Sequence, residues 1–214
     1  MWELKGLRSL SLVAGALLLV QAGVLTTLGR SILLPVTFGR LELLRVDAAA
    51  GVIVLVVLAG LAMLVGSGPS ARWIEFSLTS SITVFLVAQL NGVSDIGALV
   101  LIYAATTGMV LFAVLQDRVL VSRGHPLLPL CFAAALGIVP WGVLAFNQIG
   151  AGLAGLGPSV IVRLVTLVML ASAATFFVSQ WRGAHRLRRG ERMHVLLSFT
   201  SASAFAWLVV LGLG

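Results

Sequence analysis

Seven long apolar stretches are the feature of this sequence that most constrains its fold. A helix that crosses the hydrocarbon core of a bilayer needs about 20 mostly apolar residues, and short polar breaks separate the stretches. We place the predicted spans at residues 9–28, 48–66, 72–91, 96–116, 126–147, 159–180 and 193–213. The apolar runs are continuous rather than alternating, which argues against a membrane β-barrel. The sequence therefore predicts an all-α membrane protein made of a single seven-transmembrane domain over residues 1–214.

Composition supports the same class and indicates the partners. Hydrophobic residues make up 60% of the chain and charged residues 10%, too few charges to cover a soluble domain of this size. We therefore expect the lipid bilayer as partner and the cell membrane, crossed several times, as location. The net charge of +7 comes almost wholly from arginine at helix ends and in connections. Anionic head groups explain arginines in these places better than a nucleic acid does, so we expect no nucleic-acid partner.

The distribution of basic residues predicts the orientation of the bundle. Of the fourteen lysines and arginines, four fall on the side away from the N-terminus: Arg30, Arg40, Arg45 and Arg163. The other ten fall on the side that holds the N-terminus. Because positive charge is retained on the cytoplasmic side, the sequence predicts a cytoplasmic N-terminus and an extracellular C-terminus.

Several motifs occur in a fixed order along the predicted spans. They are Arg72-Trp73-Ile74-Glu75-Phe76-Ser77 in the third span, Gly137-Ile138-Val139-Pro140-Trp141 in the fifth, and Leu197-Ser198 followed by Ala206-Trp207 in the seventh. In order, spacing and predicted orientation the chain resembles heliorhodopsin, the inverted rhodopsin family, over most of its length. The resemblance implies a rhodopsin-like bundle of seven helices with inverted topology.

The resemblance also implies a missing anchor for retinal. It places the retinal-bearing lysine four residues before Ala206, where this chain has Ala202, and Ser198 and Trp207 hold the register on both sides. The only lysine, Lys5, precedes the first predicted span. A Schiff base needs a primary amine, and the arginine guanidinium does not serve. We therefore expect no covalent retinal site; retinal or another apolar ligand held non-covalently remains open as the cofactor.

The candidate ligand pocket combines one acid with hydroxyl, aromatic and small residues. Its members are Glu75, Thr79, Thr83, Trp141, Ser198, Ser201 and Ala202. Glu75 matches the family's counterion, and an ionisable residue inside a span indicates a functional site because it is costly there. Thr79 and Thr83 follow Glu75 at steps of four residues, so the three share one helix face.

Each of these residues also has a structural interpretation. Glu75 lies near the start of its span, where it could reach water or pair with Arg72 or Arg192. The hydroxyl groups could make ordinary hydrogen bonds between helices, and Trp141 could serve packing alone. If Glu75 is deeply buried without a cation, we expect its carboxyl to be protonated. The space vacated by a lysine at position 202 would be filled by Phe205 or Phe176, or by an apolar ligand.

Small residues and histidines complete the predicted features. Ala104 and Gly108, and likewise Ala133 and Gly137, are spaced by four, which permits close helix approach. The resemblance implies a homodimer through this region; packing within one protomer is the alternative. The three histidines, His125, His185 and His194, all fall at predicted helix ends, so we expect none to handle a proton deep in the bundle.

The sequence shows no enzyme signature: it has no glycine-rich phosphate loop, no metal-ligand cluster, and no nucleophile with a base at membrane depth. We expect neither catalysis nor a metal. The leading hypothesis is a non-pumping binding, signalling or regulatory module, with a regulatory protein as a further partner. One alternative is a channel or small-solute transporter that uses Glu75 and Arg163. Another is a photoreceptor with non-covalent retinal. The simpler role of Arg163 is to reach the interface or pair with Glu42, Asp47 or Asp95.

Overall fold

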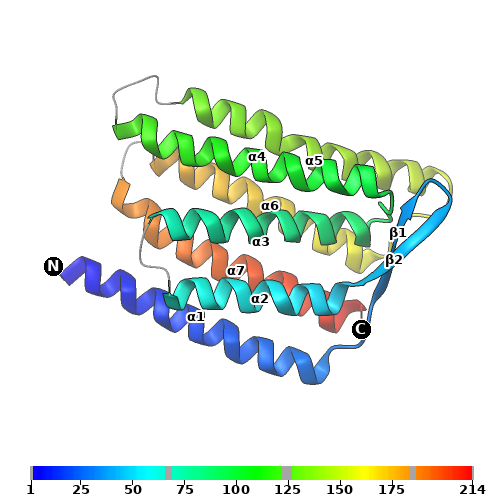
Figure 1. The fold of residues 1–214 in the computed structure, drawn as a ribbon, viewed down its shortest axis with the longest axis horizontal. Helices are drawn as coiled ribbons and strands as arrows, with labels where there is room; N and C mark the ends of the chain where they lie inside the picture. Colours follow the sequence, from blue (N-terminus) through cyan, green and yellow to red (C-terminus); the bar gives the residue numbers. More distant parts are fainter. Residues whose placement is uncertain (1, 66–68, 122–126, 184–186, 214) are drawn as a thin grey trace.

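A computed structural model describes residues 2–65, 69–121, 127–183 and 187–213, apart from some side chains next to the gaps, among them that of Arg72. His125 and His185 lie outside the described residues. The described residues form seven helices and one hairpin (Figure 1). In order these are α1 (Trp2–Leu28), β1 (Leu33–Phe38), β2 (Leu41–Asp47), α2 (Ala48–Val65), α3 (Pro69–Leu90), α4 (Ile96–Val121), α5 (Leu128–Leu153), α6 (Val160–Gly183) and α7 (Leu187–Leu213).

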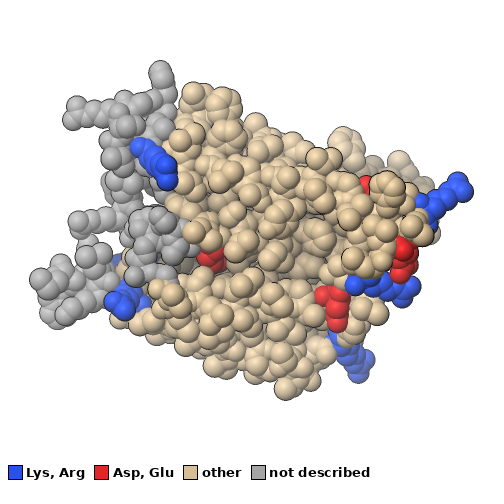
Figure 2. All heavy atoms as spheres, viewed as in Figure 1, with Lys and Arg blue, Asp and Glu red and all other residues tan. Residues whose placement is uncertain are grey.

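All seven helices are long and apolar enough to cross a membrane, which confirms the predicted number of spans and nearly all of their limits. The described acidic and basic side chains gather toward the two ends of the long axis, and uncharged surface lies between them (Figure 2). Among the limits of the membrane spans, the largest difference is at the end of α5, predicted near residue 147 and observed at Leu153. The helix continues there because the amides of Asn147 and Gln148 both donate to Asn91.

The main core lies where α1, α2, α3 and α7 meet, with smaller contributions from the other helices. Leu18, Val52 and Phe205 are fully buried in it. The contact between α1 and α2 is close enough for their backbones to touch. A Cβ atom added to Gly15 would lie 2.8 Å from the carbonyl oxygen of Gly60, closer than real Cβ atoms come to such a group. Glycine at these two positions therefore sets the distance between the helices.

The hairpin between α1 and α2 was not predicted from the sequence. β1 and β2 pair antiparallel through a two-residue connection at Gly39 and Arg40, with a bulge between Val36 and Thr37. Gly39 has φ of +60°, a conformation that a two-residue hairpin turn requires and glycine adopts without strain. The amide of Thr37 donates to the carbonyl of Ser94 at 2.8 Å, which attaches the hairpin to the link between α3 and α4.

Asp47 joins the hairpin to the membrane bundle. Its Oδ1 accepts hydrogen bonds from the amides of Ala49 (3.0 Å) and Ile32 (3.1 Å), and its Oδ2 accepts one from the Ser31 hydroxyl (2.8 Å). The bond from Ala49 makes Asp47 the N-cap of α2. Burial acts to raise the pKa of Asp47, but the hydrogen bonds from Ile32, Ser31, Ala50 and Ala49 outweigh it and hold this pKa below its usual value of 3.8.

Candidate functional site

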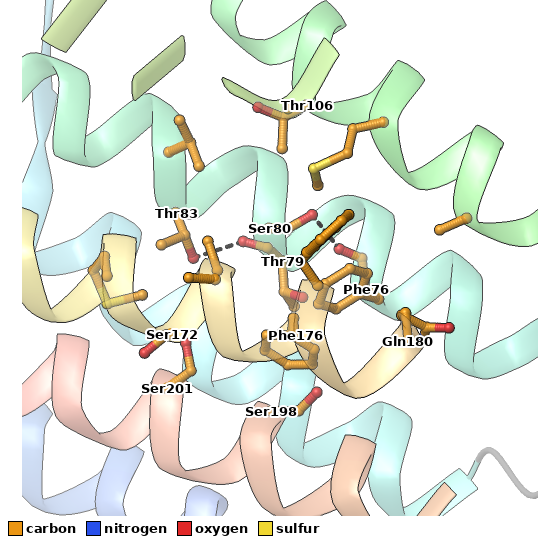
Figure 3. Close-up of a pocket in the computed structure, with 18 of the residues that line it drawn as sticks. Phe76, Thr79, Ser80, Thr83, Thr106, Ser172, Phe176, Gln180, Ser198 and Ser201 are labelled. Atoms are coloured by element: carbon orange, nitrogen blue, oxygen red, sulfur yellow. Dashed lines mark hydrogen bonds between the residues drawn. The ribbon is translucent and has the colours of Figure 1, made fainter. Parts of the chain in front are cut away.

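A cavity of about 370 Å³ lies within the bundle, and described residues of α2 through α7 line it (Figure 3). This volume is within the roughly 300 to 1,000 Å³ of small-molecule sites in proteins. The structure places all seven predicted pocket residues on its wall: Glu75, Thr79, Thr83, Trp141, Ser198, Ser201 and Ala202. Glu75 and Ala202, which are 127 positions apart in the chain, therefore line the same cavity.

Glu75 is buried in the wall of this cavity. It is 8% exposed, although it lies near the start of α3. The hydroxyl of Thr79 lies 2.9 Å from the carbonyl oxygen of Glu75 and 3.1 Å from its carboxyl Oε1, and donates to both. Among the described residues the only ion pair joins Arg45 to Glu42, so the expected pairing of Glu75 with Arg192 is absent. The side chain of Arg72 lies outside the described residues.

The threonine hydroxyls bond within their own helix instead of across to neighbours. Thr83 donates to the carbonyl oxygen of Thr79 at 2.7 Å, as Thr79 does to Glu75 one turn earlier. The expectation of ordinary bonds between helices is therefore wrong for these two residues. Ser198, which is 8% exposed, has no hydrogen-bond partner for its Oγ among the described residues. These hydroxyl groups leave lone pairs available to an occupant of the cavity.

Polar and apolar lining residues are unevenly distributed. The acid and most hydroxyls come from α3, α6 and α7, and Figure 3 shows Ser172 and Phe176 of α6 near Ser198 and Ser201 of α7. The lining residues of α5 are almost entirely apolar and include Trp141, which also packs against the main core. The cavity is therefore mostly apolar, and its few polar groups come mainly from α3, α6 and α7.

The space around Ala202 is only partly filled by neighbouring side chains. Phe205, one of the two residues expected to fill it, is fully buried in the core and does not line the cavity. Phe176, the other, does line it. A cavity remains despite this aromatic ring, so side-chain collapse has not closed the site.

His194 packs against aromatic residues of the cavity wall without lining the cavity itself, and its burial was not predicted from the sequence. It is 5% exposed, although it was expected to be a helix-end residue. Its ring lies 6.0 Å from that of Trp73, 5.2 Å from Phe76 and 5.6 Å from Phe176, centre to centre. These three aromatic residues line the cavity. The available signal was spacing, because His194 precedes Ser198 by four residues and therefore lies on the same helix face.

Arg163 does not share the site with Glu75. It is exposed in the first turn of α6, and it makes no ion pair with Glu42, Asp47 or Asp95, so the expected pairing is wrong. Glu75 lies near the start of α3, and α3 and α6 begin at opposite ends of the bundle (Figure 1). The two charged residues are therefore separated along the long axis.

Gly108 and Gly137 serve contacts within the protomer. A Cβ atom added to Gly108 would lie 2.6 Å from Cδ2 of Leu136, and one added to Gly137 would lie 2.5 Å from Sδ of Met109. Both contacts join α4 to α5, and a larger residue at either position would require the side chain of Leu136 or Met109 to move. A homodimer through this region stays a prediction.

Comparison with known proteins gives the family. The heliorhodopsin family model matches residues 41–213. This chain belongs to the heliorhodopsin family. The chain is also similar to the crystal structure of thermophilic rhodopsin, with a TM-score of 0.65 over 98% of this chain and 91% of that one. The identity in that comparison is 13%, so it shows the shared rhodopsin fold alone. No curated protein matches the chain.

Covalent retinal does not fit this member of the heliorhodopsin family. The only lysine, Lys5, lies near the start of α1, and α1 supplies no described residue to the cavity wall. Ala202, at the position where the family resemblance implies the lysine, has no group that can condense with an aldehyde. The chemistry of the site is therefore that of a buried acid and hydroxyl groups around an apolar space.

Proposed function

We propose that this heliorhodopsin-family protein is a non-pumping binding module that holds an apolar ligand without a covalent bond. The ligand occupies the cavity between α3, α5, α6 and α7, and its presence or absence is passed to a regulatory protein partner. In this proposal the N-terminus is cytoplasmic, as the arginine distribution predicts. The protein works as a ligand-dependent membrane component, with no enzymatic step.

The observation that supports the proposal most directly is a cavity retained beside Ala202. Empty apolar space costs about 24 cal/mol per Å³ in proteins, so a bundle that has no use for the space gains stability by filling it. In this chain Ala202, Ser198 and Ser201 all present small side chains to the cavity. A ligand that enters from the bilayer supplies the missing contacts.

The separation of Glu75 from Arg163 weighs against the transport alternative. A substrate site that used both would have to span most of the bundle, and the only described charged residue on the cavity wall is Glu75. A flux assay in proteoliposomes, with Glu75→Gln as the control, distinguishes a transporter from a binding module. We expect no solute flux above that of protein-free vesicles.

Absorption spectroscopy with added all-trans retinal tests the proposal. We expect the parent protein to form no pigment that survives denaturation, and Ala202→Lys to form a visible, covalently bound one. Thr200→Lys is the matched control, because Thr200 is on the same helix but exposed. It should stay colourless.

Each other outcome has a definite meaning. A visible band in the parent that disappears on denaturation would favour the photoreceptor alternative with non-covalent retinal. Colour in the parent that persists through denaturation would refute the absence of a covalent site. A folded Ala202→Lys protein that never takes up retinal would count against an apolar ligand cavity at this place.

A further inference from the structure

Several hydroxyl groups of the cavity wall can accept a hydrogen bond but have already used their protons. The hydroxyl protons of Thr79, Thr83, Ser172 and Thr106 all go to backbone carbonyls of their own helices, at 2.7 to 2.9 Å. The lone pairs of these oxygens remain unused. A polar group that binds here finds several acceptors. Ser198 adds a buried hydroxyl that has no partner among the described residues and can either donate or accept.

Charge adds a second, independent constraint. Glu75 is the only ionisable side chain among the described residues on the cavity wall, and no described cation pairs with it. A buried carboxylate is stable only when a cation and hydrogen bonds compensate it. Without a cation the buried carboxyl is therefore expected in its neutral form. An ammonium group that binds beside it would compensate the ionised form, and the described lining supplies no such cation.

The aromatic residues near Glu75 suit the same kind of group. Trp73, Phe76 and Phe176 line the cavity, and the rings of Phe76 and Phe176 lie 4.7 Å apart. Aromatic faces attract ammonium groups, most strongly where water is excluded. Acid, hydroxyl acceptors and aromatic rings thus lie together on the wall, while the lining residues of α5 offer an apolar surface for a hydrocarbon.

We propose that the ligand is a long-chain primary amine, with its ammonium group against Glu75 and Ser198 and its hydrocarbon chain along α5. This inference rests on the proposed function and specifies the ligand class. An ammonium group has three donors and no acceptor, which matches a carboxylate, a free serine oxygen and the threonine lone pairs. An alcohol lacks the charge, and a fatty acid would bring a second carboxyl beside the first.

Equilibrium dialysis with three radiolabelled probes tests this inference. Dodecylamine, dodecanol and dodecanoic acid differ only in their head groups, and each is dialysed at pH 7 against the protein in zwitterionic nanodiscs and against empty nanodiscs. Subtracting the empty discs removes partition into lipid. We expect dodecylamine to bind the protein at least tenfold more tightly than dodecanol, and dodecanoic acid to bind most weakly.

Two variants separate the site from general attraction of cations. Glu75→Gln should weaken dodecylamine at least tenfold and leave dodecanol within twofold of the parent. Glu42→Gln, which removes an exposed carboxyl of the hairpin far from the cavity, should change neither. If Glu75→Gln fails to fold, Ser198→Ala replaces it, with an expected threefold or greater loss of amine affinity at constant dodecanol affinity.

The outcomes distinguish this inference from the function on which it rests. Equal affinity for amine and alcohol, or an unchanged amine affinity in Glu75→Gln, refutes the amine and leaves an apolar binding module. Tightest binding of dodecanoic acid also refutes it. If none of the three probes binds above empty nanodiscs, the proposed function itself fails.

Discussion

Replacement of Asn91 by alanine should loosen the helices that enclose one side of the cavity. Asn91 is buried at the end of α3. Its side-chain Nδ2 donates to the carbonyl of Val87 (2.7 Å) and to Oγ1 of Thr166 on α6 (2.8 Å), and its Oδ1 accepts from Nε2 of Gln148 on α5 (2.6 Å). Two of these three bonds join different helices. Asn91 therefore fastens α5 and α6 to α3.

The expected cost follows from those two bonds. A side-chain hydrogen bond between membrane helices contributes about 0.6 kcal/mol on average and at most about 1.7 kcal/mol. Asn91→Ala should therefore lower the free energy of unfolding by about 1 to 3 kcal/mol. Equilibrium unfolding in mixed micelles with increasing sodium dodecyl sulfate, followed by far-ultraviolet circular dichroism, measures this quantity.

A double-mutant cycle tests the assignment to individual bonds. Asn91→Ala and Gln148→Ala remove the same bond, so their combined effect should fall short of additivity by about 0.5 kcal/mol or more. Asn147→Ala is the control, because Nδ2 of Asn147 donates to the backbone carbonyl of Asn91, which alanine keeps. Additive behaviour of Asn91 with Gln148, or a total loss below about 0.3 kcal/mol, would refute the reasoning.

Two further predictions concern the membrane boundary and the contact between α1 and α2. Asp47→Ala should lower the stability by about 1 kcal/mol through loss of the α2 N-cap. Because folding lowers the pKa of Asp47, the greater stability of the parent should be complete above pH 3.8 and should disappear as pH falls through the pKa of the folded state. Thermal unfolding from pH 3 to 7 measures this difference. An equal advantage at pH 3 would contradict this. Gly60→Ala should cost about 1 to 3 kcal/mol, because its Cβ would lie 3.1 Å from the carbonyl oxygen of Gly15. Gly142→Ala, with nothing within 4 Å of the added atom, should leave stability unchanged or slightly raised, and equal losses in the two variants would exclude the backbone contact as the cause.

The spans and the cavity residues were predictable because both follow from local periodicity. A run of about 20 apolar residues has few alternatives to a membrane helix. Steps of four residues from Glu75 to Thr79 and Thr83, and from Ser198 to Ala202, fix which side chains share a face. The family resemblance then indicated that these two faces meet, which the structure shows.

The features that were missed depend on contacts between distant segments. The end of α5 was predicted near residue 147, yet the helix continues because Asn91, which directly follows α3, accepts hydrogen bonds from the side-chain amides of Asn147 and Gln148. The burial of His194 depends on rings from α3 and α6. The hairpin was overlooked although Gly39, between two short runs rich in apolar residues, indicates a turn.

Because α1 supplies no described residue to the cavity wall, its residues and those of the wall evolve under different constraints. Substitutions in α1 mainly affect its packing on α2 and α7, whereas substitutions in α3 and α7 also change which ligand the cavity can bind. Homologues that differ in ligand preference should therefore show no matching divergence in α1. For the same reason, a reporter group attached at the exposed Val20 of α1 would respond to rearrangement of the helices without competing with a ligand for the cavity.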